Sequence, residues 1–283
     1  MSSTTSSERI KPIDIKAVFE SKNPRLAKML PGFIFAYLKR IARQDFLNEF
    51  LGKYGNKFDL EFIDAAIKDF NVTIILKGEE NLPKSGRYVF AANHPLGGFD
   101  GIVLMHIIGK YYKDFRYLVN DLLMNISNIK GLFIPINKHG KQATEAARMM
   151  DEVFQSDMQI LTFPAGLVSR KIKGRIIDLE WKKSFITKAI QYKRDIIPVH
   201  MSGHNTNFFY RLANFRKFLG IKSNIEMLYL VDETYKHRNK TIEVTFGKPI
   251  PWQTFDRSRN YRAWAKYVKE KVYALAGVKN IPL

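Results

Sequence analysis

The sequence predicts an α/β fold in which a mixed, largely parallel sheet is flanked by helices and preceded by an N-terminal amphipathic helical extension. Two observations carry this prediction. From residue 71 onward, short runs rich in β-branched and aromatic residues alternate with longer helix-like segments, as in layered α/β proteins. Before residue 71, apolar residues recur at helical spacing with Lys and Arg between them. With 283 residues, of which 46% are hydrophobic, the chain is long enough to bury a substantial core.

The first 70 residues are expected to form a tail and a set of helices. Residues 1–12 are rich in Ser and Thr and are predicted to be a flexible tail. Residues 13–70 are predicted to be amphipathic helices, with helix-like stretches at 13–30 and 31–54. In the second stretch, aromatic residues such as Phe33 are interleaved with cations such as Arg40, which suits a helix lying on a membrane. The same apolar stripe also suits packing on the chain's own domain, so both interpretations stay open.

Residues 71–283 are predicted to form one domain of alternating strands and helices. The expected strands lie at 72–76, 88–92, 115–119, 131–138, 159–163, 196–200, 227–231 and 241–246. The expected helices lie at 101–109, 142–155, 181–192, 208–219 and 261–275. Functional groups of such a sheet gather at the carboxyl ends of its strands, which is where His94, Asn137 and Gly166 fall.

The segment that follows the strand at 88–92 is the most informative about chemistry. It reads Asn-His-Pro-Leu-Gly-Gly-Phe-Asp, so His94 and Asp100 lie six positions apart across a turn that contains Pro95. Asp100 falls near the start of a helix and could reach back to one nitrogen of His94, and a neutral imidazole held by a carboxylate can remove a proton from a hydroxyl near pH 7. The alternative is an ordinary strand-to-helix turn in which Asp100 caps the helix and His94 lies on the surface.

Three later segments follow this one in a recognisable order: residues 131–138, residues 160–170 and the apolar strand at 195–201. Together with the His94 segment, they resemble the glycerolipid acyltransferase superfamily of the lysophosphatidic-acid acyltransferase type. The blocks of that superfamily read Asn-His-x4-Asp, Gly-x-Ile-Phe-Ile-x-Arg, Phe-Pro-Glu-Gly-Thr-x-Ser and an apolar Pro-Val strand. The resemblance spans residues 72–251 and implies that residues 71–283 are an acyltransferase domain.

Two positions depart from the superfamily's blocks. Asn137 stands where the superfamily usually has Arg, and Ala165 stands where it usually has Glu; in phosphate-using members these positions help to hold glycerol phosphate. The third block, Phe-Pro-Ala-Gly-x-x-Ser-Arg, is more similar to the hemolysin branch, which O-acylates lyso-ornithine or lyso-glycine lipids. The resemblance therefore implies a lyso-aminolipid as the preferred acceptor, with its carboxylate on Arg170 or Lys171. The alternative is a 1-acylglycerol-3-phosphate acyltransferase of phospholipid synthesis.

The resemblance also implies direct acyl transfer from a thioester, with His94 and Asp100 as the catalytic pair. The chain has no Cys and no His beside Ser169, so nothing indicates a covalent acyl-enzyme. His94 would take the proton of the acceptor hydroxyl, Asp100 would orient the imidazole, and N–H groups of the Gly166 turn would stabilise the oxyanion. No bound cofactor or metal is expected; the acyl donor would be acyl-ACP or acyl-CoA. The residues expected to bind substrate are Asn137, Lys138, Phe163, Pro164, Gly166, Ser169 and Arg170.

The net charge of +19 predicts an anionic partner. Anionic lipid, an acidic acyl carrier protein, the phosphates of coenzyme A and nucleic acid would all be attracted. No run approaches the ~18 apolar residues of a membrane span, and the first residues lead into no apolar signal core. We therefore expect a cytoplasmic protein attached peripherally to the inner face of the cell membrane. Its expected partners are acyl carrier protein or a CoA thioester, a lyso-lipid acceptor and an anionic membrane surface.

Two further patterns allow other interpretations. His200 and His204 are four residues apart, as metal ligands on a helix can be, but their segment is strand-like and loop-like and no carboxylate or Cys accompanies them. Aromatic and basic residues mix at 181–185 and 208–217, as in proteins that stack bases and bind phosphates. Their spacing is that of helix cores and matches no common nucleic-acid motif. A non-catalytic nucleic-acid-binding protein is the second alternative to acyl transfer.

Overall fold

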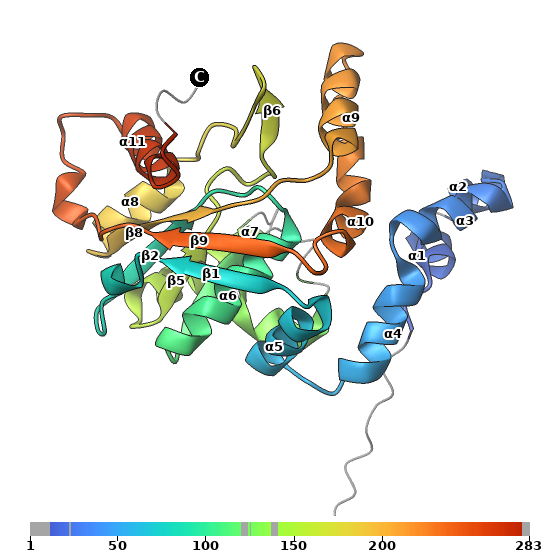
Figure 1. Ribbon diagram of the computed structural model, residues 1–283, viewed down its shortest axis with the longest axis horizontal. Helices are drawn as coiled ribbons and strands as arrows, with labels where there is room; N and C mark the ends of the chain where they lie inside the picture. Colours follow the sequence, from blue (N-terminus) through green and yellow to red (C-terminus); the bar gives the residue numbers. More distant parts are fainter. Residues whose placement is uncertain (1–11, 23, 120–123, 125, 137–140, 279–283) are drawn as a thin grey trace, which may run out of the picture.

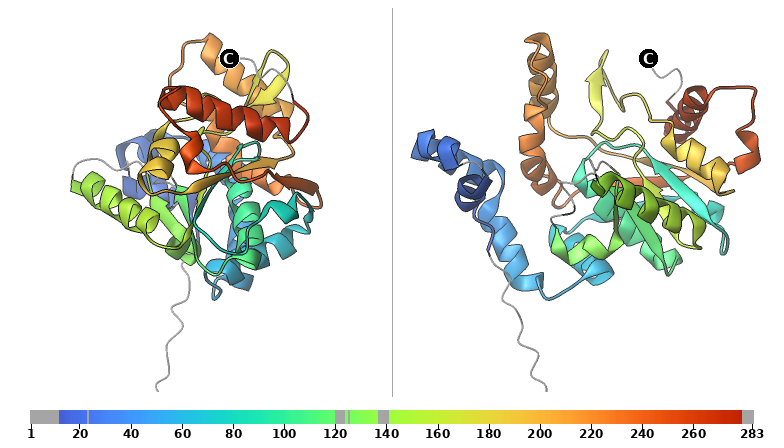
Figure 2. Two further views of the ribbon diagram at one scale, coloured as in Figure 1. Left: turned by 90° about the vertical axis from the view of Figure 1, so that its left-hand side faces the viewer. Right: turned by 180° about the vertical axis from the view of Figure 1, so that it is seen from behind.

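The computed structural model describes residues 12–22, 24–119, 124, 126–136 and 141–278. Within these residues, a seven-stranded sheet lies at the centre with helices on both faces, and a two-stranded hairpin stands apart from it (Figures 1 and 2). The sheet strands are β1 (Thr73–Lys77), β2 (Tyr88–Ala92), β3 (Phe115–Val119), β4 (Phe133–Pro135), β5 (Gln159–Thr162), β8 (Asp195–Met201) and β9 (Thr241–Phe246), and the hairpin is β6 (Arg170–Ile172) with β7 (Arg175–Ile177).

The order of the strands in the sheet is β1-β9-β8-β2-β5-β3-β4. Neighbouring strands are parallel except β8 and β9, which run antiparallel with Val199 opposite Phe246. The predicted α/β class with a mixed, largely parallel sheet is therefore confirmed. Because β2 lies between β8 and β5 and is parallel to both, the carboxyl ends of these three strands lie side by side at one edge of the sheet.

The core lies in two layers, one on each face of the sheet. Successive side chains of a strand point to opposite faces, and those of β2 are buried on both. Phe90 and Ala92 belong to the layer under α5 and α6, while Val89 and Ala91 belong to the layer under α8 and α11. Burial on both faces is typical of parallel strands. The helices of the domain are α5 (Asp59–Phe70), α6 (Gly98–Tyr111), α7 (Lys141–Gln155), α8 (Ser184–Gln191), α9 (Asn207–Phe218), α10 (Leu230–Tyr235) and α11 (Tyr261–Ala274).

The N-terminal helices form an arm at one side of the sheet (Figure 1). The second expected stretch is divided in two, because one helix ends at Ile41 and Arg43, whose φ of 48° is left-handed, precedes the next. Arg43 ion-pairs with Asp232 of α10 (2.6 Å), and Phe50 enters the main core. The expected tail falls almost wholly on residues 1–11, which lie outside the described residues. The arm comprises α1 (Ile15–Lys22), α2 (Pro24–Met29), α3 (Gly32–Ile41) and α4 (Gln44–Tyr54).

The strand expected at 227–231 is wrong. This continuous apolar run forms a short 3-10 helix, η4 (Ile225–Tyr229), which leads into α10. Met227 and Leu230, three positions apart, pack toward Val168, whereas Leu228 and Val231 are exposed. The run therefore has helical rather than strand periodicity, a distinction that a short apolar run does not reveal in sequence.

Other expected elements are present with changed bounds. The helix expected at 181–192 begins only at Ser184, and the strand expected at 131–138 is limited to β4 among the described residues. The hairpin β6–β7 was not expected; it pairs Arg170 with Ile177 directly after the third block. This hairpin brings residues 175–178 back to the carboxyl end of the sheet.

Candidate active site

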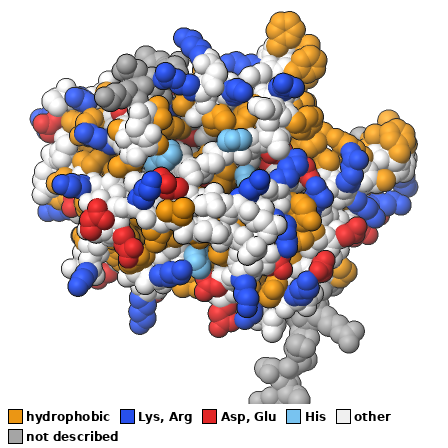
Figure 3. Space-filling model, in the orientation of Figure 1, with side chains coloured by type: hydrophobic (Ala, Val, Ile, Leu, Met, Phe, Trp, Pro, Cys, Tyr) orange, Lys and Arg blue, Asp and Glu red, His pale blue; other side chains and the backbone are white. Residues whose placement is uncertain are grey.

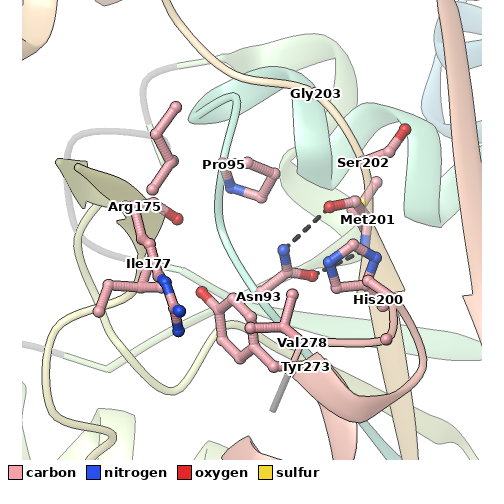
Figure 4. Close-up of a pocket in the computed structure, with 14 residues that line it drawn as sticks. Asn93, Pro95, Arg175, Ile177, His200, Met201, Ser202, Gly203, Tyr273 and Val278 are labelled. Atoms are coloured by element: carbon pink, nitrogen blue, oxygen red, sulfur yellow. Dashed lines mark hydrogen bonds between the residues drawn. The ribbon is translucent and has the colours of Figure 1, made fainter. Parts of the chain in front are cut away.

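Asn93 fixes the chain where β2 ends. Its Nδ2 donates to the carbonyl oxygen of Met201 (2.9 Å), and its Oδ1 accepts from the Met201 N–H (2.7 Å) at the end of β8 (Figure 4). The next residue, His94, is held through its own backbone. Its carbonyl accepts from the Ser169 N–H (2.8 Å), and its N–H donates to Asp178 Oδ1 (3.1 Å). These bonds place His94 at the carboxyl end of a central strand.

The structure brings the side chains of His94 and Asp100 together. His94 Nδ1 lies 2.9 Å from Asp100 Oδ2, which also accepts from the N–H groups of Leu96 (2.8 Å) and Gly97 (3.1 Å). Five residues separate the pair, one more than in an Asn-His-x4-Asp block, so the expectation of that spacing is corrected. Gly97 has a φ of 79°, which lets the chain turn tightly enough for Asp100, in the first turn of α6, to reach back.

The environment of Asp100 sets the proton positions in this pair. Asp100 is fully buried, and desolvation raises its pKa, while the hydrogen bond with His94 acts in the opposite direction. Its Oδ1 has no hydrogen-bond partner among the described residues. Because an ionised carboxylate only accepts, His94 Nδ1 carries the proton in this pair and Nε2 keeps its lone pair. The imidazole is 13% exposed and can act as a base toward a hydroxyl bound beside it.

The third block lies against the imidazole. The ring of Phe163 stacks on that of His94 with centroids 4.5 Å apart, and the carbonyl of Pro164 accepts from the Lys182 N–H. Gly166 has a φ of 67°, and its N–H donates to the carbonyl of Phe163 (2.9 Å). That N–H closes its own turn, so the expectation that it stabilises the oxyanion is not supported by its geometry. Phe163 therefore forms a wall beside the imidazole of His94.

Asp178 connects the third block to His94, and the sequence analysis missed it. It is buried, and its Oδ1 accepts from Ser169 Oγ (2.5 Å) as well as from the His94 N–H. Its Oδ2 accepts from Trp181 Nε1 (2.8 Å), and its N–H donates to the Tyr273 hydroxyl (2.7 Å). Ser169 therefore helps to hold Asp178 and the backbone of His94 in place. The signal in the sequence was a lone Asp after an apolar run, but its partners lie up to 95 residues away along the chain.

Arg170 does not face an open binding site. Its side chain is buried, Nη2 donates to Glu226 Oε1 (2.8 Å), and Nη1 donates to the carbonyl of Val168 (2.6 Å). Arg216 Nε pairs with the other oxygen of Glu226 (2.6 Å). Burial lowers the pKa of Arg170, and Glu226 opposes that shift. The expected pairing of Arg170 with a substrate carboxylate is corrected to an ion pair within the fold.

Several expected residues cannot be placed or do not converge. Asn137 and Lys138 lie outside the described residues. His200 is on β8 and His204 in the loop after it; the described part of the chain contains no group of three or more His, Cys, Asp or Glu suited to a metal ion. Burial lowers the pKa of His200. The aromatics considered as base-stacking groups are largely core residues, since Trp181, Phe209 and Tyr210 are buried.

A cleft of about 550 Å³ opens where β2 and β8 end (Figure 4). Asn93 and Pro95, which flank His94 in sequence, form part of its lining together with Ser169. The remaining lining comes from the end of β8, the β6–β7 hairpin and the end of α11. His94 itself is not among the residues that line this cleft.

Similarity to known proteins identifies the family of this chain. Residues 17–280 match the model of a family described as Acyltransferase. The chain belongs to this acyltransferase family. A lyso-glycine lipid O-acyltransferase of Bacteroides thetaiotaomicron is 52% identical over 264 residues, covering 93% of this chain and 97% of the relative. A lyso-glycine lipid O-acyltransferase of Phocaeicola vulgatus is 50% identical, covering 93% of this chain and 95% of the relative.

Among solved structures, the acyltransferase is similar to the 1-acyl-sn-glycerophosphate acyltransferase PlsC of Thermotoga maritima. The TM-score is 0.47 and the sequence identity 17%, over 88% of this chain and 95% of the other. No helix in the described ranges has both the length and the apolar composition needed to cross a bilayer.

Proposed function

We propose that this acyltransferase moves a fatty acyl chain from an acyl thioester to the hydroxyl of a lyso-lipid, with a lyso-aminolipid of the glycine class as preferred acceptor. The observation that carries the chemistry is the 2.9 Å contact between His94 Nδ1 and the buried Asp100. The acceptor class is supported by the two relatives, which are named lyso-glycine lipid O-acyltransferases and are at least 50% identical to this chain.

In the proposed mechanism, His94 Nε2 takes the hydroxyl proton as the acceptor oxygen attacks the thioester carbonyl. An O–C bond forms, the C–S bond breaks, and the imidazolium returns its proton to the departing thiolate. Asp100 orients the ring and stabilises its positive charge, as the carboxylate does in a Ser-His-Asp triad. The acceptor hydroxyl takes the place of the serine, so no acyl-enzyme is formed.

The test of this function is a product assay with purified protein. Acyl carrier protein thioester and acyl-CoA are each supplied with lyso-glycine lipid, lyso-ornithine lipid or lysophosphatidic acid, and products are identified by mass. We expect transfer to lyso-glycine lipid and a loss of about 10²–10⁴ in rate for His94→Ala, whose fold is checked by circular dichroism. Use of lysophosphatidic acid alone would establish the phospholipid-synthesis alternative, and near-normal transfer by His94→Ala would refute the mechanism.

We further propose that the protein works in the cytoplasm at the inner face of the cell membrane, with α2 and α3 seated on anionic lipid. Met29 is 78% exposed and Phe33 70% exposed, and the exposed cations Lys28 and Arg40 lie on the same two helices. Apolar side chains with cations nearby suit the boundary between headgroups and acyl chains. Acyl carrier protein, which is acidic, or coenzyme A would approach the same basic molecule as donor.

Point substitutions test this seating better than removal of the arm, because Phe50 and Arg43 connect the arm to the domain. We expect Met29→Ser with Phe33→Ser to weaken binding to phosphatidylglycerol vesicles by about tenfold or more. Phe58→Ser is the control, since Phe58 is 59% exposed outside α2 and α3. Equal binding of the double variant and the control would count against the seating.

A further inference from the structure

Helix α9 has two apolar sides, and its own domain covers only one of them. On the covered side, Phe209 and Tyr210 are buried and pack with Val168 of the third block. The other side consists of apolar residues spaced four, three and four positions apart, which places them along one stripe of a helix. These residues are Phe208, Leu212, Phe215 and Leu219. The second stripe is largely exposed to solvent.

The exposed stripe leads to an apolar tip. Helix α9 projects from the body of the molecule, and apolar side chains gather at its free end (Figures 1 and 3). We call the four exposed residues Phe215, Phe218, Leu219 and Ile221 the α9 tip. Phe215 is 59% exposed and Phe218 is 85% exposed. Removal of such side chains from water is favourable, so a contiguous exposed group of them indicates a surface that binds a partner.

The charge around the α9 tip is positive. Arg211, Lys217 and Lys222 are exposed, and residues 207–223 contain no Asp or Glu. The first acidic residue after this stretch, Glu226, is buried in ion pairs with two arginine side chains of the fold. The three exposed cations are therefore not neutralised by acidic residues of their own segment, and they favour a partner of negative charge.

Aromatic contacts place α9 on the same side of the molecule as the N-terminal arm. Tyr229 packs edge-on against Phe208 of α9 (ring centroids 4.9 Å apart) and against Tyr37 of α3 (6.4 Å apart). The guanidinium of Arg40 lies over the Tyr37 ring, 5.1 Å from its centroid. A band of aromatic and basic side chains thus connects α3 with the base of α9.

We propose that the α9 tip inserts into an anionic bilayer as a second membrane contact beside α2 and α3. A projecting apolar end can enter the region between headgroups and acyl chains without a complementary pocket, and the cations around it are attracted to anionic headgroups. A second copy of the chain is a poorer partner, because joining two tips would bring like charges together.

The consequence for catalysis rests on the proposed function. Helix α9 packs on the segment that supports His94: Val168 precedes Ser169, whose N–H donates to the His94 carbonyl (2.8 Å). Lys171, which the sequence suggested as a carboxylate partner, instead donates to Asn207 Oδ1 at the base of α9 (3.3 Å). One helix therefore connects the membrane contact to the site. We expect the α9 tip to matter for an acceptor held in a bilayer and not for one dispersed in detergent.

Vesicle binding tests the insertion independently of acyl transfer. Phe215→Ser with Phe218→Ser should reduce partitioning into phosphatidylglycerol vesicles, measured by co-sedimentation, by about tenfold or more. The control is Phe58→Ser with Tyr261→Ser, which removes aromatics that are 59% and 46% exposed, next to α5 and on α11, away from α9 (Figure 1). The control variant should bind like the unsubstituted protein. Equal partitioning of the tip variant and the control would refute the insertion.

The charge of the lipid is tested with Lys217→Gln and Lys222→Gln combined. Binding to phosphatidylglycerol vesicles should fall by about tenfold, because each basic residue near an anionic surface adds attraction. Binding to phosphatidylcholine vesicles, which have no net charge, should be weaker and should not change. Equal losses on both lipids would contradict an anionic bilayer as the partner.

Turnover connects the α9 tip to the proposed function. In Phe215→Ser with Phe218→Ser, transfer to an acceptor embedded in vesicles should fall by about tenfold, while transfer to detergent-dispersed acceptor stays unchanged. Two results combined with unchanged vesicle binding would overturn the proposal. Loss of a dimer in sedimentation would assign the tip to a contact between copies, and a raised KM for acyl carrier protein thioester would assign it to the acidic carrier. Absence of transfer by the unsubstituted protein would refute the proposed function and leave the vesicle result standing.

Discussion

At the scale of single residues, Asp100 combines a charge with complete burial. Because burial raises its pKa, the folded protein holds this proton at pH values where the unfolded chain has released it. The stabilisation from that proton is present below about pH 4, the unfolded pKa, and is lost as pH rises toward the folded pKa. Ionisation of Asp100 in the folded protein therefore lowers the free energy of unfolding.

We therefore expect Asp100→Asn to lower kcat by about 10²–10⁴, because the imidazole loses the group that stabilises its charge. The free energy of unfolding of Asp100→Asn, relative to that of the unsubstituted protein, should increase as pH rises from 4 to 7. Urea unfolding across that range measures the difference. A difference that is constant with pH would show that the buried carboxyl does not titrate differently in the folded protein.

Asp178 is expected to be a positioning residue. In Asp178→Asn one carboxylate oxygen becomes an amide NH₂, which opposes either Trp181 Nε1–H or the donors from His94 and Ser169. We expect a loss of about 1–3 kcal/mol in the free energy of unfolding and a reduced kcat with little change in KM. A double-mutant cycle with Trp181→Phe checks the cause: the second substitution should cost less in the Asn background. Strict additivity would contradict this account.

The sequence was informative about residues whose partners are local. The contact of His94 with Asp100 was predictable because both lie in one short turn, and so was the position of Phe163 beside the site. The pairing of Arg170 with Glu226 and the bonds of Asp178 depend on segments that meet only after folding. Local spacing carries no information about those partners.

At the scale of elements, the turn between β2 and α6 controls the site. Gly97 has a φ of 79° and a ψ of −136°, a backbone region that side chains rarely adopt, and an added Cβ would come within 3.1 Å of Leu230. Gly98 has open space around its Cβ position and begins α6 in an ordinary conformation.

Gly97→Ala should therefore destabilise the protein by about 1–3 kcal/mol and reduce activity, because the Gly97 N–H helps to hold Asp100. Gly98→Ala is the matched control and should be nearly neutral in both respects. Thermal unfolding and turnover of the two variants give the comparison. Equal effects of the two substitutions would mean that the turn is not strained as described.

Element prediction succeeded where periodicity was clear. The strands at 88–92, 115–119 and 241–246 have the bounds expected from alternation and turn residues. The run at 227–231 failed because five consecutive apolar residues fit a strand and a helix equally well. The hairpin β6–β7 was missed because its strands have only three residues each.

At the scale of the whole molecule, His237 makes the fold sensitive to acid. Burial lowers its pKa from 6.5 to about 4, so the unfolded chain takes up a proton between these values while the folded protein does not. Stability should fall as pH drops from about 6.5 to about 4. The contribution of this one group is about 3 kcal/mol.

His237→Gln should flatten this acid limb, because Gln remains neutral over the range. Chemical unfolding at pH 7 and pH 4.5 gives the measurement, and the loss between the two values should be smaller in the variant than in the unsubstituted protein. An identical loss in both would assign the acid sensitivity to other groups.

The strand order has a consequence for biosynthesis. Among the described residues, strand β1 borders only β9 in the sheet, with Thr73 opposite Thr241, so the edge formed by residues 73–77 stays unpaired until residues 241–246 have left the ribosome. The growing chain therefore carries an open strand edge during most of its synthesis. Such an edge can pair with other chains and aggregate, and the sheet can close only late.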